Sequence, residues 1–295
     1  MEKLKIDVFE IVKKLEIAAR DLVTTKIIGN YRSVFKGHGL EFEGFEDYTP
    51  GDDSRLIDWK SSKKANRLLI KNFKEERNLS TLFLIDASST MVCSSIEKLK
   101  NEYAAEFVAS LSYIMLDVGD SVGFALFSDT IIKKLPPARR RHQFYAILRN
   151  LANPLFYGGD YDLGNALKFT MNFLEKNSVV IIVSDFIGLK GEWQKYLEIA
   201  AGKFDIIGVM IKDPVDEVLP EEQHHVMLKD PISGKNLLVV PDQIRERYGE
   251  YVKNQKRLIR SAFLKSNCDF VELFTDKSFI VEIIKFLKKR ERRRK

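Results

Sequence analysis

The sequence is poor in the residues that stabilise small secreted proteins or build zinc sites. It holds only two cysteines, Cys93 and Cys268, in 295 residues, too few and too far apart for a disulfide framework or a four-ligand zinc site. Its apolar runs, such as residues 179–183, are far shorter than the roughly 18 residues of a spanning helix. Residues 1–5 alternate in charge where a signal peptide would turn apolar. We therefore expect a protein of a reducing, cytoplasmic compartment.

Net positive charge is confined to one short segment. The formal net charge is +6, but residues 285–295 alone carry eight basic side chains and one Glu, so residues 1–284 sum to −1. The basic character therefore belongs to the C-terminal tail, which we delimit as residues 288–295. Such a tail is either a solvated helix end or a tether to RNA, an anionic membrane or an acidic partner.

The apolar pattern changes twice along the chain. Residues 3–23 have apolar side chains at helical spacing, and residues 29–78 are short glycine-punctuated runs typical of loops and hairpins. From Ser80 onwards, apolar strands alternate with amphipathic helices. Ser94, with Glu97 three residues later, predicts a capping box at the first of these helices. The alternation predicts a three-layer, doubly wound α/β domain with a mostly parallel sheet, preceded by an N-terminal helix and hairpin region at residues 1–79.

The predicted elements after Ser80 span residues 80–287. They are strands at 81–85, 122–127, 179–183, 205–211 and 270–274, and helices with an apolar stripe at 99–114 and at 144–151, 162–174, 193–201, 242–265 and from 276 onwards. Within an insertion at 220–241, runs 226–228 and 237–240 predict a hairpin.

Oxygen-bearing side chains follow several of the predicted strands. Asp86, Ser88 and Thr90 come after the first, Asp160 precedes a helix, and Asp185 follows another strand. Ligands of open α/β sheets bind beyond the carboxyl ends of the strands, and carboxylates with hydroxyls suit a hard divalent cation such as Mg²⁺. The alternative is that these side chains only cap helices and turns.

Two motifs resemble a known family. Asp86-Ala87-Ser88-Ser89-Thr90 is similar to the Asp-x-Ser-x-Ser motif of the metal-ion-dependent adhesion site in von Willebrand factor A domains. The stretches Gly37 to Phe42 and Tyr48 to Lys60 resemble the hallmark of the bacterial domain of unknown function 58 family, which joins that hallmark to an A-type domain. The resemblance covers roughly residues 25–290.

The resemblance implies a set of metal ligands. Asp86, Ser88, Thr90 and Asp185 stand at four of the family's ligand positions, with Thr90 in place of the usual Ser. Tyr161 stands where the family has a Thr, and a phenol cannot reach as a Thr hydroxyl does. We expect Asp160 to fill that place. The extra carboxylate would tighten cation binding but would also neutralise the positive charge that attracts an acidic partner residue.

The resemblance also implies a function. Family members are commonly linked to MoxR-type AAA+ ATPases, so it predicts a non-enzymatic, Mg²⁺-binding protein-interaction module that serves such an ATPase in the maturation or remodelling of other proteins. Arg55 and Trp59 have two interpretations: Arg55 pairs with a carboxylate while Trp59 packs against the sheet, or both form a recognition surface. The enzymatic alternative is a metal-dependent phosphohydrolase, although Ser88 stands where the haloacid dehalogenase pattern requires a second Asp.

Overall fold

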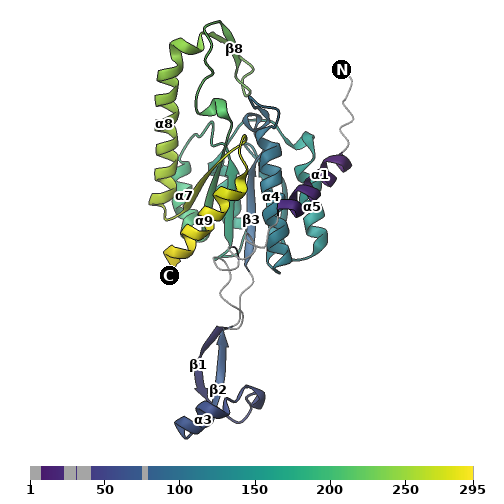
Figure 1. Ribbon diagram of the computed structural model, residues 1–295, viewed down its shortest axis with the longest axis vertical. Coiled ribbons are helices and arrows are strands. Elements are labelled where there is room, and N and C mark those ends of the chain that lie inside the picture. The colour runs from purple at the N-terminus through teal and green to yellow at the C-terminus, as the bar shows by residue number, and fades with distance from the viewer. Residues whose placement is uncertain (1–7, 23–30, 32–40, 75–78, 295) are drawn as a thin grey trace.

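A computed structural model describes residues 8–22, 31, 41–74 and 79–294 of the chain. Its centre is a six-stranded sheet in the order β10-β7-β6-β3-β4-β5 (Figure 1). The strands are β3 (Ser80–Asp86), β4 (Ser121–Phe127), β5 (Ile131–Ala138), β6 (Val179–Ser184), β7 (Asp205–Lys212) and β10 (Asp269–Phe274). All neighbouring pairs are parallel except β4 and β5. The predicted α/β class with a mostly parallel sheet is confirmed.

Helices cover both faces of this sheet. One apolar layer joins it to α4 (Lys100–Asp117), α5 (Arg141–Leu151) and α9 (Phe279–Arg294), and α1 (Val8–Leu22) packs on α4 and α5. The other layer joins the sheet to α6 (Leu163–Phe173), α7 (Trp193–Ala201) and α8 (Pro241–Lys265). Successive residues of β3 alternate between the layers: Phe83 and Ile85 face the first, and Leu84 faces the second. The predicted doubly wound, three-layer arrangement is therefore present.

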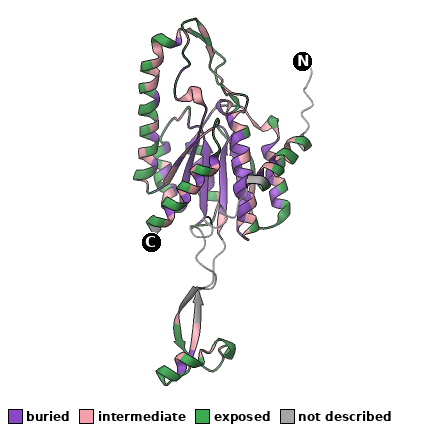
Figure 2. Cartoon of the chain, in the orientation of Figure 1, coloured by how far each residue is buried: buried purple, intermediate pink, exposed green. Residues whose placement is uncertain are grey.

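The central strands are buried along almost their whole length, as Figure 2 shows. Because both of their faces meet helices, they are continuous apolar runs without polar alternation. At Gly208 in β7, an added Cβ would lie 2.6 Å from a ring carbon of Phe263 and 2.8 Å from one of Phe270. Only glycine allows α8 to approach the sheet this closely.

β5 is the strand that the sequence analysis missed. It lies at the edge of the sheet, antiparallel to β4, and contains Pro136 and Pro137. Proline is tolerated at a sheet edge, where a missing N–H leaves no central hydrogen bond unmade. The two prolines interrupt the pattern of a regular strand.

A smaller unit precedes the α/β body in sequence and lies apart from it in Figure 1. It consists of the antiparallel pair β1 (Glu41–Asp47) and β2 (Leu69–Lys74), connected through the short helices η1 (Ser54–Leu56) and α3 (Trp59–Ala65). Asp58 caps α3 by accepting a hydrogen bond from the Ser61 N–H at 2.8 Å. This unit confirms the hairpin expected in this part of the chain.

A second hairpin lies between β7 and α8. Its strands are β8 (Val226–Lys229) and β9 (Asn236–Val239), as predicted for the insertion, and η4 (Pro214–Asp216) precedes them. At the C-terminus, residues 288–294 continue α9, and Arg290 is buried there with ion pairs to Asp205 and Asp269. Part of the basic tail is thus folded into the body. No helix within the described ranges is long and apolar enough to cross a membrane.

The predicted capping box at Ser94 is wrong. The helix begins at Lys100, after the short helix η2 (Ser89–Val92). Ser94 instead donates hydrogen bonds to the Lys98 carbonyl at 2.9 Å and to Asp213 Oδ2 at 2.6 Å. Asp213 follows β7, so a contact distant in sequence has displaced the local one.

Candidate functional site

The candidate site begins with Asp86, the last residue of β3, which is fully buried. Its Oδ1 accepts a hydrogen bond from the Ser88 N–H at 2.8 Å. Its Oδ2 accepts one from the hydroxyl of Ser184, at the end of β6, at 2.6 Å. Asp86 therefore connects the turn after β3 with the neighbouring central strand.

A row of oxygens extends from this turn to the residue after β6. Ser88 Oγ lies 3.0 Å from Thr90 Oγ1, and Thr90 Oγ1 donates to Asp185 Oδ1 at 3.2 Å. The Ile187 N–H donates to the same Oδ1 at 2.9 Å. Ser88, Thr90 and Asp185 are all buried. The structure thus brings four of the five predicted ligands to one edge of the sheet; we call Asp86, Ser88, Thr90 and Asp185 the oxygen cluster.

Excess negative charge is concentrated in this cluster. Burial, followed by the nearby charge of Asp185, raises the pKa of Asp86 to about 7, although hydrogen bonds from Ser184 and Ser88 oppose the shift. The hydroxyl of the fully buried Tyr161 lies 3.2 Å from the Ser184 hydroxyl. Two carboxylates in a buried place are stabilised by an added positive charge.

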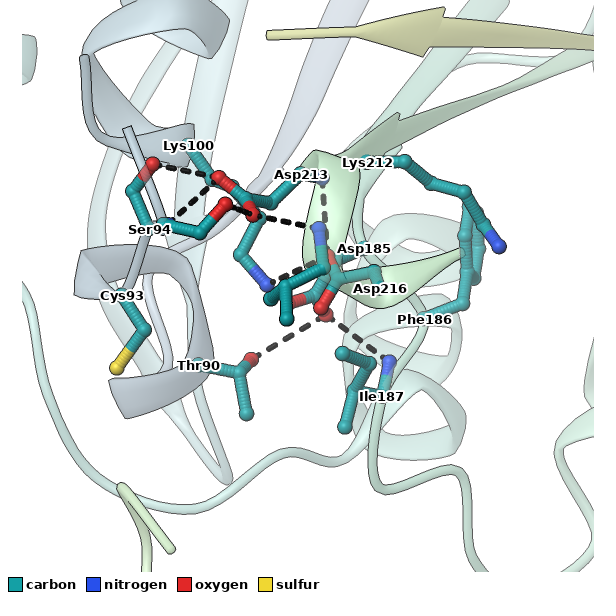
Figure 3. A network of polar contacts seen from close by, with 12 residues as sticks. Thr90, Cys93, Ser94, Lys100, Asp185, Phe186, Ile187, Lys212, Asp213 and Asp216 are labelled. Carbon is teal, nitrogen blue, oxygen red and sulfur yellow. Dashed lines mark hydrogen bonds and ion pairs between the residues drawn. The ribbon is translucent and has the colours of Figure 1, made fainter. Parts of the chain in front are cut away.

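One positive charge is already present, at Lys100. Its side chain is only 3% exposed, and its Nζ lies 2.7 Å from Asp185 Oδ2 and 3.2 Å from Oδ2 of Asp216, the last residue of η4 (Figure 3). Burial lowers the pKa of Lys100, but the charges of Asp185 and Asp216 outweigh it and raise that pKa above its ordinary value. Lys100 is therefore a buried ammonium ion.

Asp160, the fifth predicted ligand, has other partners. Its side chain is 46% exposed, forms an ion pair with Lys190 and accepts a hydrogen bond from the Tyr161 N–H at 2.8 Å. Among the described residues, no hydrogen bond or ion pair joins it to the oxygen cluster. The phenol ring of Tyr161 is fully buried and packs on Phe127, with ring centroids 5.7 Å apart.

The sequence analysis missed Lys100, Asp213 and Asp216. Asp213 accepts hydrogen bonds from Ser94 and from the backbone and hydroxyl of Ser95, which fixes the segment between η2 and α4. The strand-end rule that found Asp86 and Asp185 could also have found Asp213, since it follows β7 directly. No sequence signal marked Lys100, because its partners come from the residue after β6 and from η4.

The predicted recognition residues lie on the smaller unit. Arg55 forms an ion pair with Asp53 at 2.7 Å, as one interpretation predicted, yet its side chain remains 87% exposed. Trp59 is 70% exposed, so the prediction that it packs against the sheet is wrong. Trp and Arg are both enriched in interface hot spots, and both are exposed on this unit.

The oxygen cluster fits a hard divalent cation by its chemistry. Within residues 8–22, 31, 41–74 and 79–294, no group of three or more His, Cys, Asp or Glu side chains could hold a metal ion. A cation here would therefore depend on hydroxyl ligands and water, which Mg²⁺ accepts and Zn²⁺ rarely does. The donor set is two carboxylates and two hydroxyls.

The fold and the site together define a class: a three-layer α/β protein whose sheet carries a hydroxyl- and carboxylate-lined carboxyl edge. Residues 45–258 match the family described as Protein of unknown function DUF58. This match covers more than half of the chain, and the chain belongs to that family. The resemblance based on the Tyr48 to Lys60 stretch is confirmed.

Relatives of the chain are themselves uncharacterized. It is 21% identical over 287 residues to the uncharacterized protein Rv1480 of Mycobacterium tuberculosis (strain ATCC 25618 / H37Rv), covering 95% of this chain and 89% of the relative. It is 24% identical over 164 residues to the uncharacterized protein MAV169 of Mycobacterium avium, covering 54% of this chain and 95% of that protein.

Solved structures similar to the chain include A-type domains. BatB from Bacteroides thetaiotaomicron, a conserved hypothetical protein, has a TM-score of 0.48 at 14% identity, with 73% of this chain and all of that chain covered. A von Willebrand factor type A protein from Catenulispora acidiphila has a TM-score of 0.40 at 11% identity, covering 76% of this chain and 43% of that one. Similarities at this level carry no functional conclusion.

Proposed function

We propose that this chain is a non-enzymatic protein-interaction module that binds one Mg²⁺ ion at the carboxyl edge of its sheet. The supporting observation is the row of contacts from Ser88 through Thr90 to Asp185, with Asp86 buried beside it. These four residues would hold the ion, and water would complete its shell. The ion would supply positive charge to an edge where buried carboxylates are in excess.

The partner is proposed from the family resemblance: a MoxR-type AAA+ ATPase of the bacterial cytoplasm, in a complex that matures or remodels other proteins. Arg55 and Trp59 are a proposed second contact for that partner. Their exposure, 87% of the Arg55 side chain and 70% of Trp59, leaves both accessible.

Thermal unfolding with and without Mg²⁺ tests the metal site. A ligand at ten times its dissociation constant adds about 1.4 kcal/mol to the free energy of unfolding. We expect the parent to show this stabilisation and Thr90→Val to lose most of it. Thr81→Val is the matched control, because Thr81 is a buried threonine at the opposite end of β3 whose hydroxyl has no hydrogen-bond partner among the residues that the structure describes.

The proposal is wrong for the metal if Thr90→Val and Thr81→Val respond to Mg²⁺ alike. For the partner, we expect a purified MoxR-type ATPase to bind the parent in calorimetry and to bind Trp59→Ala at least about tenfold more weakly, as hot-spot truncations commonly do. Equal affinity of parent and Trp59→Ala would exclude Trp59 from the interface.

The geometry does not favour the phosphohydrolase alternative. A nucleophilic carboxylate must reach its substrate, whereas Asp86 is fully buried and both of its oxygens accept hydrogen bonds from the chain. Turnover in a broad phosphatase screen, abolished by Asp86→Asn, would reverse this preference.

A further inference from the structure

Lys100 occupies a position that helix energetics disfavour. It is the first residue of α4, where the helix dipole repels a positive charge. It is also buried, which is costly for an ammonium ion unless opposite charges compensate it. A residue that violates two local rules is expected to have a role in the site that it touches.

The contacts of Asp185 suggest this role. Its Oδ2 accepts from Lys100, while its Oδ1 accepts from Thr90 and from the Ile187 N–H (Figure 3). Lys100 thus binds Oδ2 of Asp185, while Oδ1 of Asp185 faces the Thr90 hydroxyl. The Lys100 contact therefore fixes the orientation of the Asp185 carboxylate, with Oδ1 against Thr90, a proposed ligand.

Lys100 contacts the oxygen cluster directly, through its ion pair with Asp185. Lys212, labelled nearby in Figure 3, has its Nζ 2.6 Å from Glu217 Oε1 and is engaged there. Asp216 shares Lys100 with Asp185 and also accepts a hydrogen bond from the Asp213 N–H at 3.0 Å. An ion added at the cluster would meet the repulsion of the Lys100 ammonium across a buried carboxylate, where screening by water is weak.

We infer that Lys100 is a resident cation of this site: it keeps the oxygen cluster assembled without metal and competes with a divalent ion for the charge of Asp185. This inference rests on the proposed function, since it describes how the same site is regulated. Lys100 is a positioning residue, and its ammonium makes the native site bind Mg²⁺ weakly. Occupancy of the site would then depend on the free Mg²⁺ concentration.

Removing the charge tests this inference. Lys100→Met removes the ammonium, and Lys100→Gln removes the charge but retains an N–H donor for Asp185. Lys98→Met is the matched control, because Lys98 pairs with Glu106 and its side chain is 40% exposed. Thermal unfolding is followed against MgCl₂ concentration at constant ionic strength, with EDTA as the metal-free reference.

We expect both Lys100 variants to unfold at lower temperature than the parent in EDTA, and their apparent Kd for Mg²⁺ to be tighter by about tenfold or more, the effect of removing one nearby charge from a poorly screened site. Lys98→Met should behave as the parent. If the variants unfold only in EDTA and refold with Mg²⁺, the inference is supported, because the divalent ion replaces the missing charge. If they fold at no Mg²⁺ concentration, it is overturned.

The remaining outcomes separate the inference from the proposed function. Equal Mg²⁺ affinity of parent and Lys100 variants overturns the inference and leaves the metal site standing. Stabilisation by Mg²⁺ in the Lys100 variants but not in the parent supports the inference and shows that the native chain does not bind Mg²⁺. No response in any protein overturns both.

Discussion

Asp86 makes the stability of the metal-free protein depend on pH. Its pKa is raised to about 7 by burial and by Asp185, against about 4 in an unfolded chain. Between these values the folded state binds the proton and the unfolded state does not, so the free energy of unfolding falls as pH rises. We expect urea unfolding in EDTA to show this fall between pH 5 and 7, and Asp86→Asn to abolish it.

The control for this prediction is Asp53→Asn. The hydrogen bond from the Arg55 side chain lowers the pKa of Asp53 to about 2, so Asp53 is ionised in both states above pH 5. Its replacement should leave the slope unchanged. A slope that persists in Asp86→Asn would show that another group causes it.

Tyr31 offers a second prediction for a single side chain. It is buried, and its hydroxyl donates to Oδ2 of the buried Asp120 at 2.6 Å. Tyr31→Phe should lower the free energy of unfolding by about 1–3 kcal/mol, because the carboxylate loses a buried donor. Tyr145→Phe, which removes an exposed hydroxyl 2.9 Å from Glu16, should change it by less than about 0.5 kcal/mol in the same denaturant titration. If Tyr31→Phe and Tyr145→Phe lower the free energy of unfolding equally, the hydrogen bond of Tyr31 is not a buried one.

At the scale of elements, α9 is anchored by its own basic residues. Arg290 is 4% exposed and contacts Asp205 and Asp269, whose side chains are 33% and 18% exposed. Arg290→Ala should lower the free energy of unfolding, measured in urea, by about 2 kcal/mol. This loss is smaller than that from breaking a fully buried ion pair, because both aspartates keep contact with water. Arg292→Ala, at an exposed position of the same helix, should cost less than about 0.5 kcal/mol. If Arg292→Ala lowers the free energy of unfolding as much as Arg290→Ala does, Arg290 does not anchor α9.

The ion pairs of Arg290 determine how binding of the C-terminal tail to RNA or an anionic membrane should be tested. Deleting residues 288–295 would remove Arg290 and destabilise the body, so lost binding could reflect unfolding. Neutralising Lys288, Lys289 and Arg292 together retains the anchor. Steeply salt-dependent binding that disappears in this variant would support a tether.

Elements were predictable where a single pattern determined them. The strands that became β3, β6 and β7 are buried on both faces and stand out as apolar runs, and the strand-end rule then located Asp86 and Asp185. β5 was missed because an edge strand carries prolines and an irregular burial pattern. The partners of Ser94, Lys100 and Asp160 come from distant loops, and periodicity contains no information about such contacts.

At the scale of the whole molecule, the smaller unit has both an exposed aromatic ring and a buried side chain of its own. Trp59 on α3 is 70% exposed, whereas Leu69 at the start of β2 is only 6% exposed. Trp59→Ala should leave the free energy of unfolding within about 0.5 kcal/mol of the parent, as is usual for surface positions. Leu69→Ala should weaken the unit by about 2 kcal/mol, the cost of a small cavity. Hydrogen exchange of β1 and β2 amides would measure both, and fast exchange in Trp59→Ala would show that the ring supports the fold.

The paired prolines of β5 have a consequence for crowded solutions. Pro136 and Pro137 offer no N–H groups, and Lys133 and Lys134 on the same strand are exposed. Missing donors and lysines are how natural sheets discourage another chain from adding a strand. The sequence of β5 therefore disfavours the addition of a strand from another molecule at this edge of the sheet, which opposes aggregation at high protein concentration.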